Sequence, residues 1–149
     1  MDIDTRKVIL VGDKCVGKSS LVRYALTGEY EQAYLPTLGV EVHPLVWNNN
    51  GVVRRFNIWD TAGDPRYGGL SEGYYIQAQI AIILHKSGQN TRGDWFDKVR
   101  NMCPDIPIVE CVNHFDEDVP NLRTNEDLIH LNTASGQGVD DLFDYLITL

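Results

Sequence analysis

The chain has 149 residues, of which 43% are hydrophobic and 23% are charged, so it is long enough for one domain with its own core and too apolar to be disordered. Its formal net charge of -8 argues against a dedicated nucleic-acid binder and against docking on an anionic membrane. We therefore expect a single domain over residues 1–149, without a C-terminal extension and without a nucleic-acid or membrane partner.

Hydrophobic patterning predicts alternating strands and helices. In chain order these are a strand at 7–11, a helix at 17–26, strands at 38–47 and 52–59, a strand at 78–84, a helix at 95–102, a strand at 106–112 and a helix at 139–147. The Asn-Asn-Asn-Gly sequence at 48–51 predicts a hairpin turn, since Asn and Gly tolerate positive φ. The sequence thus predicts an α/β fold with a mostly parallel sheet and one antiparallel hairpin.

The segment between the first strand and the first helix fits the pattern GxxxxGK[ST] over residues 12–19. Glycines let successive backbone N–H groups curl around phosphate oxygens, and the helix N-terminus adds a positive dipole end. Lys18 supplies a charge to the terminal phosphates, and the Ser19 hydroxyl can ligate Mg²⁺. The position between an apolar strand and a helix favours a phosphate-binding loop over a chance match.

Two further polar motifs follow later strands. In Asp-Thr-Ala-Gly, Asp60 can hold Mg²⁺ through water and the Gly63 N–H can meet a γ-phosphate. In Asn-His-Phe-Asp, Asp116 can accept two hydrogen bonds from guanine, which adenine does not offer, and Asn113 can bond the base and brace the phosphate loop. Each motif alone is an ordinary turn sequence, but the order of all three predicts a guanine-nucleotide site.

The three motifs in this order resemble the small GTPases of the Ras superfamily. Four stretches, at residues 27–30, 37–45, 59–63 and 73–79, bring the chain closest to the Ran branch of that superfamily. The resemblance implies a three-layer P-loop NTPase fold and a monomeric switch that binds GTP or GDP with Mg²⁺ and hydrolyses GTP. It also implies Ran-type effectors, exchange factors or activating proteins, bound through a switch face at residues 34–45 and 63–79.

The resemblance also assigns residues to roles. Ser19, Thr37 and, through water, Asp60 would hold Mg²⁺, and Tyr30 would lie beside the guanine. The nucleotide-binding set that it implies is Gly12, Asp13, Lys14, Cys15, Val16, Gly17, Lys18, Ser19, Ser20, Tyr30, Thr37, Gly63, Asn113, His114, Asp116, Thr133 and Ala134. The catalytic set is Lys18, Thr37, Gly63 and Asp64.

Two departures from the family pattern bear on hydrolysis. Asp64 stands where the family has a water-positioning Gln; it only accepts hydrogen bonds, is shorter, and is repelled by the γ-phosphate. Pro65 biases it further toward extended geometry. We therefore expect slow hydrolysis, with Asp64 as a general base as the alternative. Lys14 excludes an activator's arginine finger, replaces that finger, or points to solvent; the sequence leaves all three open.

Two other departures concern the base and the second half of the chain. His114 replaces the Lys of Asn-Lys-x-Asp, which predicts weaker guanine affinity with selectivity retained by Asp116. The segment at 117–127 is short and contains Pro120, so the family's fourth helix is expected to be shortened or absent. Its acidic residues also put in doubt any partner that needs the basic patch of Ran.

Cysteine usage and the start of the chain predict an intracellular protein of the cytoplasm, the nucleus or both. The three cysteines form no Cys-x-x-Cys, and the acidic first residues carry no signal-peptide pattern. The four histidines are scattered without metal-ligand spacing, so packing or surface roles are favoured over ligation.

The alternative function is a hydrolysis-deficient Ran mimic that binds nucleocytoplasmic-transport partners. A third possibility, another P-loop enzyme such as a kinase, leaves the Asp-Thr-Ala-Gly and Asn-His-Phe-Asp motifs unexplained.

Overall fold

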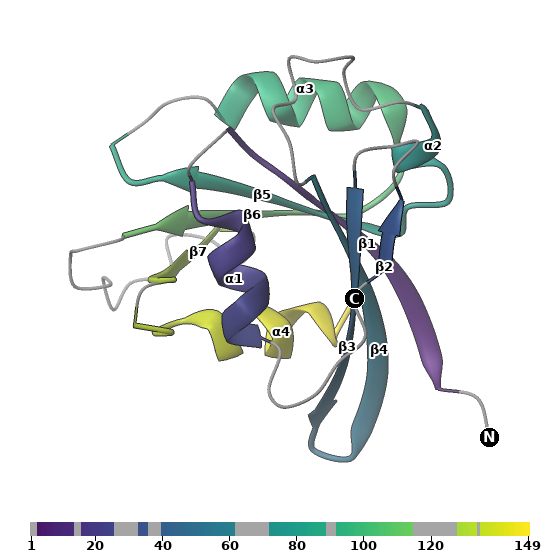
Figure 1. The fold of residues 1–149 in the computed structure, drawn as a ribbon, viewed down its shortest axis with the longest axis vertical. Helices are drawn as coiled ribbons and strands as arrows, with labels where there is room; N and C mark the ends of the chain where they lie inside the picture. Colours follow the sequence, from purple (N-terminus) through teal and green to yellow (C-terminus); the bar gives the residue numbers. More distant parts are fainter. Residues whose placement is uncertain are drawn as a thin grey trace.

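The computed structural model describes residues 3–13, 16–25, 33–35, 40–61, 72–88, 92–114, 128–133 and 135–149. Figure 1 shows its elements, which in chain order are β1 (Asp4–Val11), α1 (Lys18–Ala25), β2 (Ala33–Leu35), β3 (Val40–Asn49), β4 (Val52–Thr61), α2 (Glu72–Tyr75), β5 (Ile80–Lys86), α3 (Arg92–Met102), β6 (Ile108–Asn113), β7 (Leu128–Leu131) and α4 (Val139–Leu146).

The strands form one sheet in the order β2-β3-β4-β1-β5-β6-β7. From β4 to β7 every neighbouring pair is parallel, whereas β3 runs antiparallel to both β4 and β2. The predicted α/β fold, with a mostly parallel sheet and one antiparallel hairpin, is confirmed. The three-residue strand β2 adds an antiparallel pair that its short sequence did not signal.

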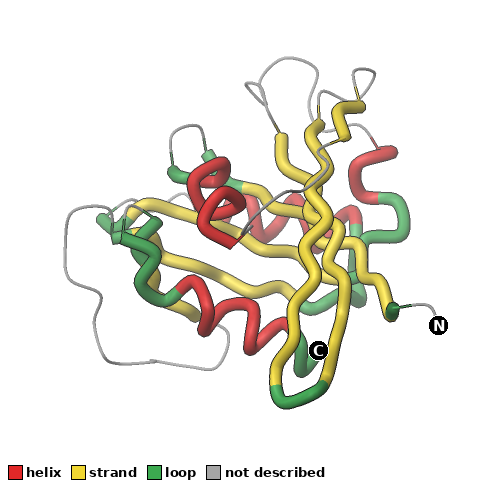
Figure 2. Tube along the Cα trace, turned by 60° about the horizontal axis from the view of Figure 1, so that its bottom comes forward, coloured by secondary structure: helices red, strands yellow, loops and turns green. Residues whose placement is uncertain are grey.

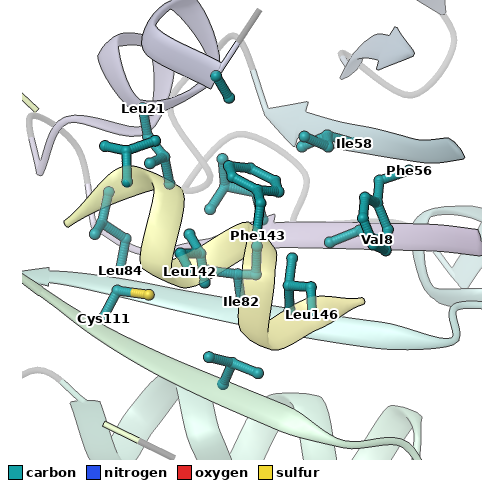
Figure 3. Close-up of a cluster of buried hydrophobic side chains, with 14 of the residues drawn as sticks. Val8, Leu21, Phe56, Ile58, Ile82, Leu84, Cys111, Leu142, Phe143 and Leu146 are labelled. Carbon is teal, nitrogen blue, oxygen red and sulfur yellow. The ribbon is translucent and has the colours of Figure 1, made fainter. Parts of the chain in front are cut away.

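Helices cover both faces of the sheet, which makes the three predicted layers (Figure 1). Alternate residues of β1 divide between two cores: Val8 and Leu10 pack with α1 and α4, while Ile9 and Val11 pack with α2 and α3. Figure 3 shows the first core, in which Phe143 of α4 lies among side chains of several strands. Burying each such large apolar side chain contributes about 1.5–3 kcal/mol. Among the described helices, none is both long and apolar enough to cross a membrane.

The β3–β4 hairpin closes as predicted, through a two-residue turn. Asn49 pairs with Val52, and between them Asn50 has φ 54° and Gly51 has φ 85°. Two successive positive φ values give the turn a twist that matches the flanking strands. The Gly51 N–H also donates to Asn48 Oδ1 at 3.1 Å. Figure 2 shows the hairpin extending well beyond the helices.

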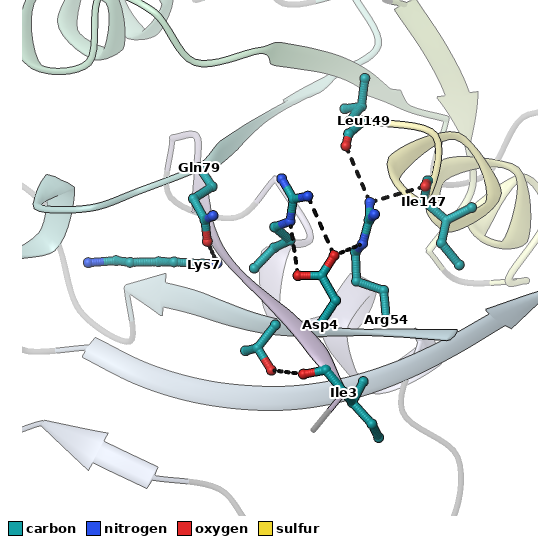
Figure 4. Close-up of polar contacts among 9 residues, drawn as sticks. Ile3, Asp4, Lys7, Arg54, Gln79, Ile147 and Leu149 are labelled. Atoms are coloured by element: carbon teal, nitrogen blue, oxygen red, sulfur yellow. Dashed lines mark hydrogen bonds and ion pairs between the residues drawn. The ribbon is translucent and has the colours of Figure 1, made fainter. Parts of the chain in front are cut away.

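The end of the hairpin is fastened to both ends of the chain (Figure 4). Arg54 Nε lies 3.1 Å from Asp4 Oδ2, and its Nη1 donates to the carbonyl oxygens of Ile147 and Leu149 at 3.1 and 3.3 Å. The hydrogen bond from Arg6, helped by the charge of Arg54, holds the pKa of Asp4 below its usual value. These contacts lie at the opposite end of the sheet from the carboxyl ends of the parallel strands.

Several boundaries differ from the prediction. Helix α3 begins at Arg92, three residues before the predicted start. Helical spacing with Trp95 and Val99 predicts Met102 on the apolar face, but Met102 is 39% exposed. Cys103, just beyond the helix, is buried in its place. Strands β5 and β6 start two residues late because Ala78, Gln79, Ile106 and Pro107 precede the ladder. Elements α2 and β7 were not predicted, and the expectation about a fourth helix concerns residues outside the described part of the chain.

Candidate functional site

The predicted site residues that the structure describes gather at one edge of the sheet. The carboxyl ends of adjacent parallel strands meet there, and each strand is followed by a polar segment. Gly12 and Asp13 follow β1, Asp60 lies near the end of β4, and Asn113 ends β6. Thr133 follows β7 shortly after. The fold therefore brings the described residues of the three motifs to one edge of the sheet.

Gly12 is required by a close approach of backbone to backbone. A Cβ added at this position would lie 2.2 Å from the carbonyl oxygen of Leu84 in β5, and the residue has φ 155°. Real Cβ atoms do not approach backbone so closely, so a side chain cannot be accommodated here without moving β5. The turn from β1 into the loop thus depends on the first glycine of the motif.

Lys18 is folded inward across the phosphate loop. Its Nζ donates to the carbonyl oxygens of Gly12 and Asp13 at 2.9 and 3.0 Å, and the residue is only 9% exposed. The ammonium group is therefore held inside the loop at the first turn of α1, as a phosphate-binding role requires. A buried cation in such a place favours an anionic ligand.

A side chain of α3 also holds the phosphate loop. Trp95 Nε1 donates to Asp13 Oδ1 at 2.9 Å. Helical spacing with Val99 predicts Trp95 on the apolar face of its helix, where it does pack. Its second role was missed because the partner lies 82 residues away in the chain and no local pattern marks it.

Asn113 joins three segments of the site by hydrogen bonds. Its Nδ2 donates to the carbonyl oxygen of Val16 at 2.9 Å and to Thr133 Oγ1 at 2.8 Å, and its Oδ1 accepts from the Thr133 N–H at 3.1 Å. The side chain is fully buried. The predicted brace from Asn113 to the phosphate loop is confirmed. Thr133 lies beside Asn113, and its role in binding the nucleotide stays a prediction.

The segment after β7 forms one wall of an open pocket with α1. Ser20, Arg23, Tyr24 and Thr133 line this pocket. Ser20 and Thr133 were predicted, whereas Arg23 and Tyr24 were not. Both lie three or four residues after Ser20, so helical spacing would have been enough to predict that they share the face of α1 that carries Ser20. A Cβ at Gly136 would meet the Tyr24 ring at 2.9 Å, which shows how closely α1 and this segment pack.

His114 lies against His130 of β7. The His114 Nε2 and His130 Nδ1 atoms are 2.8 Å apart, and His114 is 7% exposed. Burial, together with the charges of His114 and His85, lowers the pKa of His130. The two histidines are far apart in the sequence, and parallel pairing of β6 with β7 brings their side chains into contact, in agreement with the expected packing role. A contact of His114 with the base stays a prediction.

Asp60 belongs to a second group that sequence spacing did not reveal. It is 1% exposed and lies opposite Glu41 in the β3–β4 pairing, with His43 two residues further along β3. His43 Nε2 is 3.2 Å from Glu41 Oε2, and the donor atoms of all three side chains lie within 4.8 Å of one another. Burial lowers the pKa of His43, against the opposing effect of the Glu41 charge.

The donor set fits Mg²⁺ as far as it is described. Asp60 presents a buried carboxylate, the kind of oxygen donor that Mg²⁺ prefers, at the edge where Lys18 is held. The other predicted site residues lie outside the part whose side chains are described: Lys14, Cys15, Ser19, Tyr30, Thr37, Gly63, Asp64, Asp116 and Ala134. Their roles stay predictions.

A known family matches most of the chain. The description of this family is Ras of Complex, Roc, domain of DAPkinase, and it matches residues 7–116, which include all three predicted motifs. The match supports a Ras-superfamily, GTPase-like domain whose expected ligand is a guanine nucleotide. It does not single out Ran. With the motifs, the sheet order and this match in agreement, the chain belongs to the Roc family of Ras-like domains.

Proposed function

We propose that this chain is a guanine-nucleotide switch that binds GTP or GDP with Mg²⁺ and hydrolyses GTP slowly. The observation that carries the proposal is the buried Asn113 side chain, which joins the phosphate loop at Val16 to the segment at Thr133. A ligand that spans a phosphate site and a base site needs these segments held in one fixed geometry. Residues 1–149 would form the nucleotide-binding domain by themselves.

The phosphates would be held by the loop that follows β1. Lys18 is already directed into this loop, and exchange of its bonds to the Gly12 and Asp13 carbonyls for phosphate oxygens would place its charge on the ligand. The backbone N–H groups at the start of α1 would meet the same anion. The net charge of -8 does not oppose this, because the ligand meets local donors rather than the average surface.

The base and the metal would be held by residues on both sides of this loop. Asp116 would accept the two guanine donors, with Tyr30, His114 and the Thr133–Ala134 segment beside the ring. Ser19, Thr37 and, through water, Asp60 would hold Mg²⁺, which neutralises charge on the β- and γ-phosphates when it is bound. Loss of the γ-phosphate would release Thr37 and Gly63 together, which is the switch.

The slow rate follows from Asp64. A carboxylate next to the γ-phosphate is repelled and cannot donate to it, so attacking water would be poorly held. Lys14 would modify the same step, as an obstacle to an activator's arginine finger or as a substitute for it.

A second candidate keeps the nucleotide site and assigns the output to partner binding. Residues 37–45 and 68–79 resemble the Ran switch face closely in sequence. This supports a Ran-like protein of the cytoplasm or nucleus that engages Ran-type effectors or transport receptors with little turnover. The acidic residues at 117–127 count against receptors that need a basic patch.

Single-turnover GTP hydrolysis, measured beside the affinities for GDP, GTP and ADP, tests both candidates. The first predicts tight, Mg²⁺-dependent guanine binding, a slow rate, and a faster rate in Asp64→Gln. Tight binding with no turnover in either protein supports the second candidate. Equal affinity for GDP and ADP, or a rate typical of the superfamily that Asp64→Ala abolishes, would contradict the first.

A further inference from the structure

Glu41, His43 and Asp60 form a group of three potential metal ligands on one face of the sheet. In the antiparallel pairing, Glu41 lies opposite Asp60 and His43 lies opposite Ile58. Residues two apart on a strand, and residues directly opposite on its neighbour, project from the same face. The pairing therefore brings an imidazole and two carboxylates to one place, although the residues are far apart in the chain.

The distances suit a small divalent ion. His43 Nε2 and Glu41 Oε2 are 3.2 Å apart, and no two donor atoms of the group are more than 4.8 Å apart. An ion bonded at about 2.0–2.2 Å to each of two ligands holds them about 2.8–3.6 Å apart, for bond angles between about 90° and the tetrahedral angle. The His43–Glu41 pair already has this separation, and with all three donor atoms within 4.8 Å of one another, small side-chain shifts would complete a three-donor set.

The surroundings favour an ion as well. His43 is 5% exposed and Asp60 is 1% exposed, whereas the Glu41 side chain is 30% exposed and gives a way in from solvent. Two carboxylates held this close repel each other where water is largely excluded, and a divalent cation between them would remove that repulsion.

We propose that Glu41, His43 and Asp60 bind a zinc-class divalent metal ion. One nitrogen and two oxygen donors suit Zn²⁺ and its neighbours in the first transition row, whereas Mg²⁺ prefers oxygen donors alone. The site requires no nucleotide and so does not rest on the proposed function. The site spans β3 and β4 and shares Asp60 with the expected Mg²⁺ site. A bound ion would therefore hold β3, the strand that follows the first switch, against β4.

Metal titration of the purified chain tests the proposal. The chain is stripped of metal with a chelator and kept in excess Mg²⁺ without nucleotide. Zn²⁺ is then titrated by calorimetry, and Co²⁺ is added as a coloured substitute whose visible absorption rises when it leaves water for a protein site of lower coordination number. We expect one tightly bound Zn²⁺ that Mg²⁺ does not displace. His43→Gln should weaken it by more than ~100-fold and Glu41→Gln by at least ~10-fold.

His130→Gln is the matched control, because it removes an imidazole from the His114–His130 pair and should leave Zn²⁺ affinity unchanged. No Zn²⁺ binding overturns the proposal. So does binding that survives Glu41→Gln and His43→Gln but is lost in His130→Gln, which would place the ion on the other pair. If His43→Gln fails to fold, Glu41→Gln decides, since its side chain is partly exposed. GDP affinity measured on the same samples shows separately whether the proposed function holds.

Discussion

At the scale of single residues, Asn113 is the point where the phosphate loop and the segment after β7 are joined. Asn113→Ala would leave the Val16 carbonyl and both Thr133 groups without these bonds in a buried place. Since an unsatisfied buried polar group costs about 1–3 kcal/mol, we expect the free energy of unfolding in urea to fall by about 3 kcal/mol. Nucleotide affinity should fall with it.

The exposed Asn101 of α3 offers the same substitution as a control. Asn101→Ala should change the free energy of unfolding by no more than about 0.5 kcal/mol. Similar losses in the two variants would show that the Asn113 bonds do not hold the site together.

At the residue scale, a comparison of Gly12 with Gly88 distinguishes two reasons why a position requires glycine: a positive φ, and a lack of space for a Cβ atom. Both have positive φ, but a Cβ at Gly12 meets the Leu84 carbonyl oxygen at 2.2 Å, whereas a Cβ at Gly88 meets nothing within 4 Å. Both changes to Ala incur backbone strain, and only Gly12→Ala adds the clash. We expect it to be more destabilising than Gly88→Ala by about 1–3 kcal/mol in urea unfolding. Equal losses would mean that strain alone, and not the approach of β5, explains Gly12.

At the scale of elements, the hydrogen bond from Trp95 Nε1 to Asp13 Oδ1 makes α3 a support for the phosphate loop. Trp95→Phe removes the donor and keeps an aromatic ring in the core. Loss of one such bond is worth about 1 kcal/mol, so we expect backbone amides of residues 12–17 to exchange hydrogen about fivefold faster. Hydrogen-exchange mass spectrometry measures this.

Trp47 provides the control, because its Nε1 donates to Asp144 Oδ1 at the same distance of 2.9 Å but joins the hairpin to α4. Trp47→Phe should speed exchange in α4 and leave residues 12–17 unchanged. If both variants affect the loop equally, the effect is a general loss of stability rather than a local support.

The same scale explains what the sequence could predict. The apolar run of β1, the Asn-Gly turn of the hairpin and the periodic α4 follow local rules, so their positions were predicted to within a few residues. The phosphate loop and the brace by Asn113 were also predicted, because residue type and order carry them. The His114–His130 pair, the Trp95 bond and the Glu41, His43 and Asp60 group depend on which strands become neighbours, and strand neighbours have no local signal.

At the scale of the whole molecule, the buried His43 and the half-buried His130 make stability depend on pH. His43 faces Glu41, and His130 faces His114 and His85; burial lowers the pKa of both His43 and His130 below their ordinary value of 6.5. The unfolded chain therefore binds protons more readily than the folded chain just below pH 6.5. The stability that these groups contribute is complete above this pH and is lost as the pH falls through the lowered pKa values.

We therefore expect the free energy of unfolding in urea to decrease between about pH 7 and about pH 5. The double variant with His43→Gln and His130→Gln should show a flatter profile, because neither position then takes up a proton. Asp4 does not affect the comparison between about pH 7 and about pH 5. Its pKa is lowered from 3.8, so its contribution to stability is lost only in stronger acid. An unchanged slope in the double variant would mean that other groups, and not these two imidazoles, link folding of the whole chain to pH.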